Sequence, residues 1–309
     1  MTTRRNFLQH SSLAFGAMLL QPSGFANVFA GKDSLPKPGI QLFTLFNEMD
    51  TDTVGALKQV AAAGYVNIES AFSRQGGYYG RQPKEFKKLL EDMGMQWRAH
   101  HVLGAPFKMP ANAKPPVDAD GKPIKIPSMA NLRDNSQQLV DEVASAGIPY
   151  LVCANTPIET ADEIKASAAT LQKAGEQAKK AGITLVYHNH DAEFKTTEGI
   201  VAYDYFLSQV SADILKMELD LGWTLKAGVD PVQLFKRHKG RFPLWHVKDM
   251  DAAGNIVPFG DGVYDFKPIF HAAKTSGLDY FFIEQDFPKN PFESIQKGIR
   301  QYNTFSKSL

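Results

Sequence analysis

The chain has 309 residues, of which 43% are hydrophobic and 22% are charged, and this composition is typical of a globular protein. Its formal net charge of +1 excludes the strong excess of Lys and Arg with which nucleic-acid-binding domains recognise phosphate, so we expect no nucleic-acid partner. The single cysteine, Cys153, excludes a framework of disulfides within the chain.

The first 30 residues have the features of an export signal. The pair Arg4-Arg5 is followed by an apolar stretch from Leu13 to Leu20 and by Val28-Phe29-Ala30, the small-x-small form that a signal peptidase cleaves. The stretch is shorter than the ~20 residues that span a bilayer, so we expect no membrane span in the mature protein. The segment resembles a Tat-type signal peptide, which predicts a periplasmic protein with its signal over residues 1–30 and its mature domain over residues 31–309.

From Pro36 onward, apolar runs of strand length alternate with amphipathic runs of helical length. The expected strands are Ile40 to Phe46, Tyr65 to Glu69, Gln96 to His101, Tyr150 to Cys153, Thr184 to His188, Leu215 to Asp220, Leu244 to Lys248 and Tyr280 to Glu284. The expected helices include Thr53 to Ala63, Pro83 to Met93, Asn131 to Ala146, Ala161 to Ala181, Pro231 to His238 and Pro268 to Thr275. Eight such units predict an α/β protein with the (β/α)₈ TIM barrel fold, because open doubly wound sheets usually have fewer strands.

Glycines mark the ends of many of these helices. Gly64, Gly94, Gly147, Gly182 and Gly277 each stand just before the apolar residue that begins the next strand. A glycine in the left-handed conformation closes the last turn of a helix, so these positions indicate repeated helix-to-strand connections. No G-x-G-x-x-G motif follows the first strand, which disfavours a dinucleotide-binding fold.

One segment lacks this periodicity. Between His101 and Met129 the chain has six of its 18 prolines. Long irregular connections in compact domains are usually lids or binding loops. We therefore predict a lid-like insertion at about residues 103–130, against the alternative of a surface insertion without function.

Polar residues occupy the ends of six of the expected strands. They are Glu69, His100-His101, His188-Asn189-His190, Glu218-Leu219-Asp220, His246-Val247-Lys248-Asp249 and Glu284-Gln285-Asp286. The active site of a TIM barrel lies at this end of its strands. Imidazoles and carboxylates that converge there must share protons, form pairs or bind a cation, because an unpaired buried charge is strongly unfavourable. A mixed N/O site suits Mn²⁺, Co²⁺, Zn²⁺ or Fe²⁺ better than Mg²⁺ or Ca²⁺.

Several segments carry a family resemblance, most of it in the second half of the chain. They are Tyr187-His188-Asn189-His190-Asp191-Ala192-Glu193-Phe194, Asp220-Leu221-Gly222-Trp223, Ala227-Gly228-Val229-Asp230-Pro231, Trp245-His246-Val247-Lys248-Asp249-Met250 and Phe282-Ile283-Glu284-Gln285-Asp286. They resemble the xylose-isomerase-like sugar phosphate isomerase/epimerase family, which implies one divalent metal held at the ends of the last four strands. By position, the implied ligands are His188, Asp220, His246 and Glu284.

The chain departs from this family pattern at two positions. Many members have a glutamate where this chain has His188, so His190 and Glu193 are alternatives for the fourth ligand. Trp223 stands where related nucleases have a further metal-binding histidine, which disfavours a trinuclear phosphodiesterase site.

The resemblance also suggests roles for other strand-end residues. Glu284 is then both a ligand and the candidate base, with Glu69, His100 or His190 as the partner acid, and Lys248 approaches the substrate. Strand alternation turns one of His100 and His101 inward, and either assignment is open. The aromatic residues expected to stack against a sugar are Phe43, Phe46, Phe72, Tyr78, Tyr79 and Trp223.

The expected activity is that of a metal-dependent isomerase or epimerase, which abstracts a proton from a sugar or keto-sugar and passes through an enediolate. The alternative is a lyase or dehydratase that eliminates a β-substituent from a 3-keto-glycoside or an inosose. A non-catalytic sugar-binding protein is disfavoured by the set Asp220, His246 and Glu284. The predicted export favours an unphosphorylated substrate, and the chain is compatible with a homo-oligomer.

Overall fold

A computed structural model describes residues 35–107 and 129–309. The predicted export signal and the centre of the predicted lid lie outside these residues.

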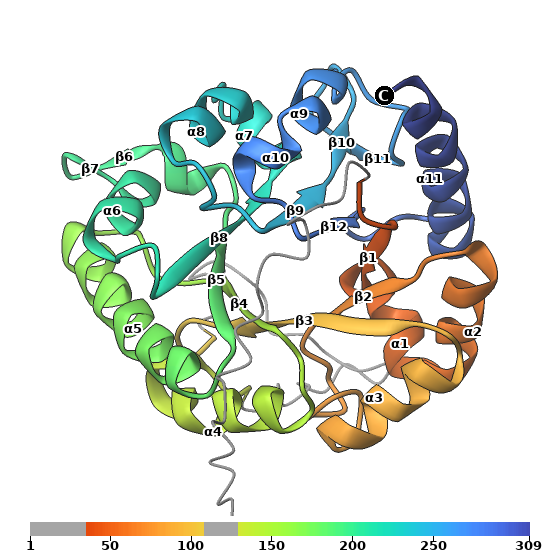
Figure 1. Ribbon diagram of the computed structural model, residues 1–309, viewed down its shortest axis with the longest axis horizontal. Coiled ribbons are helices and arrows are strands. Elements are labelled where there is room, and N and C mark those ends of the chain that lie inside the picture. Colours follow the sequence, from red (N-terminus) through yellow and green to blue (C-terminus); the bar gives the residue numbers. More distant parts are fainter. Residues whose placement is uncertain (1–34, 108–128) are drawn as a thin grey trace, which may run out of the picture.

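Eight parallel strands form a closed barrel in the order β1-β12-β9-β8-β5-β4-β3-β2 (Figure 1). They are β1 (Gly39–Gln41), β2 (Asn67–Ser70), β3 (Gln96–Leu103), β4 (Tyr150–Asn155), β5 (Thr184–His188), β8 (Leu215–Asp220), β9 (Leu244–Val247) and β12 (Tyr280–Ile283). Each strand pairs in parallel with both neighbours. The predicted TIM barrel is confirmed.

The helices surround the barrel (Figure 1). They are α1 (Phe46–Thr51), α2 (Thr53–Ala63), α3 (Pro83–Asp92), α4 (Leu132–Ser145), α5 (Ala161–Lys180), α6 (Ala202–Gln209), α7 (Leu221–Lys226), α8 (Pro231–Arg237), α9 (Lys267–His271), α10 (Ala273–Ser276) and α11 (Pro291–Phe305), with the 3₁₀ turns η1 (Leu42–Leu45), η2 (Ala192–Phe194) and η3 (Ser306–Ser308). Two hairpins complete the described elements, β6 (Thr196–Thr197) with β7 (Ile200–Val201) and β10 (Asp249–Met250) with β11 (Ile256–Val257).

Side-chain caps and glycines define where several helices begin and end. Asn131 and Thr160 accept hydrogen bonds from the backbone N–H groups of Asp134 and Glu163 in the first turns of α4 and α5. The five glycines expected to end helices all have positive φ, from 68° at Gly147 to 102° at Gly64. The sequence prediction of repeated helix-to-strand connections is therefore confirmed.

The expected first strand, Ile40 to Phe46, is wrong over most of its length. β1 ends at Gln41, whose side-chain Oε1 accepts a hydrogen bond from Phe43 N at 3.0 Å and turns the chain into η1 and then α1. A short apolar run cannot be assigned to strand or helix by its periodicity alone, and the side-chain cap decides here. The expected helix Pro268 to Thr275 is divided into α9 and α10 at Ala272.

The interior of the barrel changes from apolar to charged along its axis. Its apolar part consists of Ala99, Tyr150, Val152, Val186, Leu244, Tyr280 and Phe282. A larger apolar core separates the strands from the helices. Towards the C-terminal ends of the strands, the inward positions are instead buried Glu, Asp, His and Lys residues.

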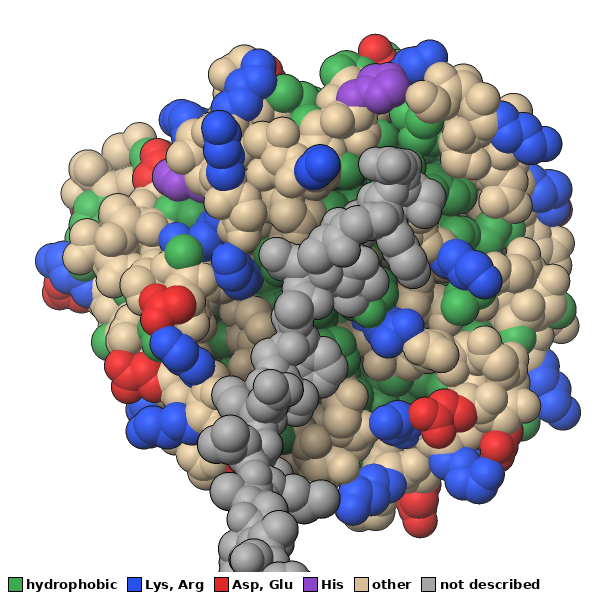
Figure 2. All heavy atoms as spheres, in the orientation of Figure 1, with side chains coloured by type: hydrophobic (Ala, Val, Ile, Leu, Met, Phe, Trp, Pro, Cys, Tyr) green, Lys and Arg blue, Asp and Glu red, His purple; other side chains and the backbone are tan. Residues whose placement is uncertain are grey.

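Charged side chains of both signs are mixed on the face of the molecule that Figure 2 shows. On the face seen in Figure 2, Lys and Arg side chains are spread around the periphery with acidic side chains among them. Within residues 35–107 and 129–309, no helix is long and apolar enough to cross a bilayer.

Candidate metal centre and active site

A β-bulge in β3 determines which of two adjacent histidines faces the interior of the barrel. Ile68 pairs with Trp97 and Glu69 pairs with Ala99, so Arg98 is the extra residue. The bulge turns Ala99 and His101 inward. His100 points outward, where its Nδ1 lies 2.7 Å from Ser70 Oγ. Of the two histidines, His101 lies in the buried cluster of ionisable side chains and His100 does not, while the catalytic role expected of His100 stays a prediction.

Glu218 lies at the centre of the buried cluster. Its Oε2 is 2.8 Å from His101 Nε2, 3.1 Å from His246 Nε2 and 3.2 Å from His188 Nδ1. Glu218 was not among the residues we expected to act, and His101 was expected only as the alternative to His100. Glu218 is two residues before Asp220 on the same strand and therefore on the same face, so strand alternation was the signal that identifies it.

His246 lies between two carboxylates that come from different strands. Its Nε2 is 2.5 Å from Glu69 Oε2, and its Nδ1 is 2.9 Å from Glu284 Oε2. Gln41 also donates to Glu69 Oε2, at 2.9 Å. The rings of His246 and His101 are stacked, with centroids 5.2 Å apart.

Lys248 forms a second layer with three carboxylates nearer the barrel mouth. Its ammonium lies 3.3 Å from Asp220 Oδ2, 3.0 Å from Glu284 Oε2 and 2.9 Å from Asp286 Oδ2. Asp220 Oδ1 accepts a hydrogen bond from Trp223 N at the start of α7, which leaves its Oδ2 for the layer. Lys248 is thus buried and compensated by acidic groups from β8 and the end of β12.

The surroundings shift the pKa values of these groups in opposite directions. Burial raises the pKa of Glu69, and the nearby Glu218 raises it further. Burial disfavours the ionised form of Glu284 as well, but Lys248 and His246 outweigh it and hold the pKa well below its usual range. Burial alone would lower the pKa of His101, whereas the carboxylates of Glu69 and Glu218 raise it to about 9.

Two alternatives for the fourth ligand lie outside the cluster. Glu193 accepts hydrogen bonds from the Tyr187 hydroxyl and the backbone N–H of His190, both at 2.9 Å, and so holds the loop after β5 in place. The side chain of His190 is 42% exposed, with its ring 5.1 Å from that of His188. Of His188, His190 and Glu193, the structure places only His188 in the cluster.

The aromatic residues expected near the substrate fall into separate groups. Phe43, Phe46 and Phe72 form a cluster with Phe287, whose side chain is 66% exposed. Tyr78 and Tyr79 are instead buried beside β2 and β3. The ring of Trp223 faces the ammonium groups of both Lys226 and Lys248.

Three buried carboxylate oxygens in this region have no hydrogen-bond partner: Glu69 Oε1, Glu218 Oε1 and Asp220 Oδ2. Such oxygens are unfavourable unless a cation or a proton satisfies them. Two overlapping groups have the geometry to hold a cation, one of His101, His188, Glu218 and His246, the other of Asp220, His246 and Glu284. The donor chemistry therefore fits a divalent metal of the kind expected from the sequence.

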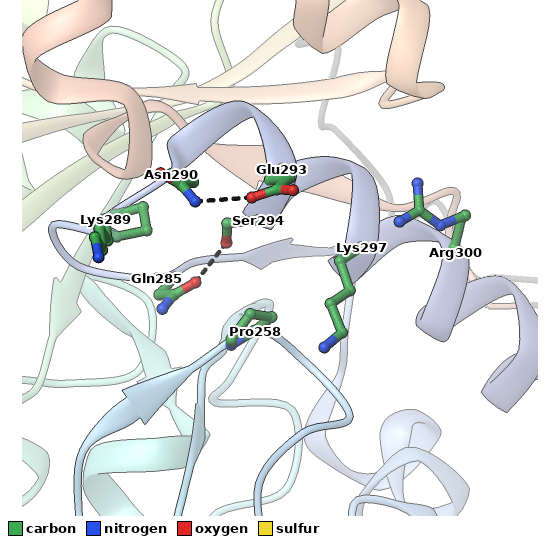
Figure 3. Close-up of a pocket in the computed structure, with 9 residues that line it drawn as sticks. Pro258, Gln285, Lys289, Asn290, Glu293, Ser294, Lys297 and Arg300 are labelled. Carbon is green, nitrogen blue, oxygen red and sulfur yellow. Dashed lines mark hydrogen bonds between the residues drawn. The ribbon is translucent and has the colours of Figure 1, made fainter.

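A surface pocket of about 410 Å³ lies apart from this cluster, beside the N-terminal end of α11 (Figure 3). Four of its polar side chains are paired with one another: Asn290 donates to Glu293 at 2.8 Å, and Ser294 donates to Gln285. Lys297, whose side chain points downward beside Pro258 in the figure, forms an ion pair with Asp261. The pocket does not share a residue with either metal-binding group.

Comparison with known proteins agrees with this arrangement. The family model described as a xylose isomerase-like TIM barrel matches residues 57–305. The chain is 28% identical over 269 residues to an inosose dehydratase from Lacticaseibacillus casei, covering 79% of this chain and 86% of that enzyme. It is 26% identical over 280 residues to an inosose dehydratase from Geobacillus thermodenitrificans, covering 80% of this chain and 87% of that enzyme. A solved structure of a sugar phosphate isomerase/epimerase from Parabacteroides distasonis is 26% identical, with a TM-score of 0.68 and coverage of 89% of this chain and 96% of that one. The chain belongs to the xylose isomerase-like TIM barrel family.

Proposed function

We propose that the protein is a metal-dependent lyase that removes a proton next to the carbonyl of a keto-sugar or keto-cyclitol and eliminates the substituent on the following carbon. The curated relatives named inosose dehydratase support this order of preference, which reverses the order expected from the sequence. A sugar isomerase or epimerase is the second candidate, supported by the name of the Parabacteroides distasonis relative.

The observation that carries the proposal is the pair Glu69 and Glu284 on either side of His246. The two carboxyl groups contact opposite nitrogens of one imidazole, at 2.5 and 2.9 Å. The pKa of Glu69 is raised and that of Glu284 is lowered. Two carboxyl groups whose pKa values are pushed apart suit the roles of acid and base, and an elimination requires one of each.

A divalent cation held by the imidazoles and carboxylates around His246 would act as a Lewis acid and polarise the substrate carbonyl. The buried oxygens Glu69 Oε1 and Glu218 Oε1, which have no hydrogen-bond partner, support its presence.

The residues then divide the proton transfers between them. The ionised Glu284 takes the proton from the carbon next to the carbonyl. As the double bond forms, the bond between the next carbon and its oxygen breaks, and the protonated Glu69 gives that oxygen its proton, so that a hydroxyl substituent leaves as water. Lys248 and His246 keep Glu284 ionised before the step through contacts of 3.0 and 2.9 Å.

The test is to incubate the metal-loaded enzyme with a keto-inositol or a 3-keto-glucoside in D₂O. We expect release of water or of the aglycone together with an unsaturated ketone, detected by mass spectrometry and near-ultraviolet absorbance. Glu69→Gln and Glu284→Gln should each lower kcat by about 10²–10⁴-fold, the range for a lost proton-transfer group. Asp279→Asn, at the opposite end of the barrel, is the control and should retain activity.

The same experiment separates the two candidate functions. A product of unchanged composition that carries deuterium at a carbon next to the carbonyl would replace the lyase by an isomerase or epimerase. Turnover without either elimination or deuterium incorporation would remove the proton-transfer roles of Glu69 and Glu284.

A further inference from the structure

We infer that the cation is held by His101, His188, Glu218 and His246, one layer deeper in the barrel than the set that includes Asp220 and Glu284. The inference rests on the proposed function, since it assigns the ligands of the cation that this function requires. His101 and Glu218 distinguish the deeper set from the set implied by the family resemblance, and both sets share His188 and His246.

The first argument is the distance between donor atoms. Three imidazole nitrogens, from three different strands, lie 2.8, 3.1 and 3.2 Å from Glu218 Oε2. Neighbouring ligand atoms in a tetrahedral zinc shell are about 3.3 Å apart, given metal–ligand distances of ~2.0–2.1 Å. The donor atoms of the four residues all lie within 4.8 Å of one another, so together they can offer three nitrogens and one oxygen to a cation. Glu218 Oε1 and Glu69 Oε1 are buried beside it without hydrogen-bond partners.

The second argument is the orientation of His246. Its Nδ1 lies 2.9 Å from Glu284 Oε2, a contact in which the imidazole donates its proton to the carboxylate. Metal-binding histidines usually donate their other ring N–H to a carboxylate or carbonyl, which orients the ring and fixes its tautomer. With Nδ1 protonated, the lone pair is on Nε2, which lies 3.1 Å from Glu218 Oε2 and 2.5 Å from Glu69 Oε2. Glu284 is then a group that orients His246 and is free to act as the base.

The third argument is the position of Lys248. Its ammonium lies 3.3 Å from Asp220 Oδ2 and 3.0 Å from Glu284 Oε2, so a positive charge already compensates the two carboxylates of the upper set. A divalent cation bound by both carboxylates would lie next to this ammonium and be repelled by it. The deeper group consists of three imidazoles and one carboxylate, and within residues 35–107 and 129–309 its ion-pair partners include no lysine or arginine.

The inference predicts which substitutions remove the metal. We would load wild type and variants with Co²⁺, remove free metal by dialysis, and measure the metal-to-protein ratio by emission spectrometry and the visible d–d absorption. His101→Gln and Glu218→Gln should lose most of the metal. His100→Gln, which changes the adjacent buried histidine outside the cluster, should keep one equivalent. Asp220→Asn and Lys248→Met should also keep one equivalent and a tetrahedral Co²⁺ spectrum.

Circular dichroism of the metal-free variants separates ligand loss from misfolding, and Glu218→Asp is a second, smaller change if Glu218→Gln does not fold. Full metal content in folded His101→Gln and Glu218→Gln, with loss in Asp220→Asn, would overturn the deeper assignment and leave the proposed lyase standing. Failure of the wild type to bind Co²⁺ would overturn both the assignment and the metal dependence of the proposed function.

Discussion

Replacing Lys248 by Met should destabilise the metal-free protein strongly, because three carboxylates would lose the buried ammonium group with which they form ion pairs. The side chain of Lys248 is 2% exposed, and its ammonium is within 3.3 Å of Asp220, Glu284 and Asp286. Met retains most of the aliphatic volume, so the loss is chiefly electrostatic. Breaking a buried ion pair by removing one partner typically lowers the free energy of unfolding by about 3–5 kcal/mol.

The assay is thermal unfolding of chelator-treated protein at pH 7. A loss of this size corresponds to a decrease in Tm of about 10 °C, since 1 kcal/mol shifts the Tm of a large domain by ~2–4 °C. The difference from wild type should shrink as the pH falls to 5, because protonation removes the unpaired negative charge from the carboxylates.

The matched control is Lys226→Met. The ammonium of Lys226 also lies over the Trp223 ring, at 4.6 Å compared with 5.2 Å for Lys248, but Lys226 is exposed. Its replacement should change the free energy of unfolding by no more than about 0.5 kcal/mol. Equal losses in the two variants would refute the view that Lys248 holds the acidic layer together.

Three further predictions concern other parts of the chain. If the cluster of Phe43, Phe46, Phe72 and Phe287 stacks against the substrate, Phe287→Ala should raise KM about tenfold, a loss of ~1.4 kcal/mol in binding, with little change in kcat or stability. The control is Val263→Ala, which changes another exposed apolar side chain. An unchanged KM in Phe287→Ala would contradict the stacking role. Burial raises the pKa of Asp279, so its folded-state pKa exceeds its unfolded value and the stability it contributes is present at low pH and lost as the pH rises through the folded pKa. Urea unfolding should therefore show that the stability of Asp279→Asn relative to wild type increases between pH 4 and pH 7, and a constant difference would count against this. Replacing Arg4 and Arg5 by Lys should leave the protein in the cytoplasm on cell fractionation, and undiminished export would remove the predicted Tat signal.

Local sequence patterns were sufficient to predict the barrel. Each of these patterns extends over only a few neighbouring residues: apolar runs of strand length, amphipathic runs of helical length, and glycines that end helices. The eight parallel strands of the barrel confirm the prediction made from them. The exception was the segment after Gln41, where the apolar residues fit either periodicity and one side-chain hydrogen bond decides for a turn.

The same patterns predicted the end of the barrel at which charged residues would gather, because parallel strands bring their C-terminal ends to one rim. They did not predict the partners within that cluster. A bulge at Arg98 reverses the alternation of β3 and selects His101 over His100, and it depends on how β3 pairs with β2. The contact between His101 and Glu218 joins residues 117 positions apart in the chain. The contact between Lys248 and Asp286 likewise joins residues 38 positions apart. The closed barrel therefore decides which carboxylates pair with Lys248 and which contact the imidazoles. The pairing of buried charges depends on distances in space, and no local pattern in the sequence determines those distances.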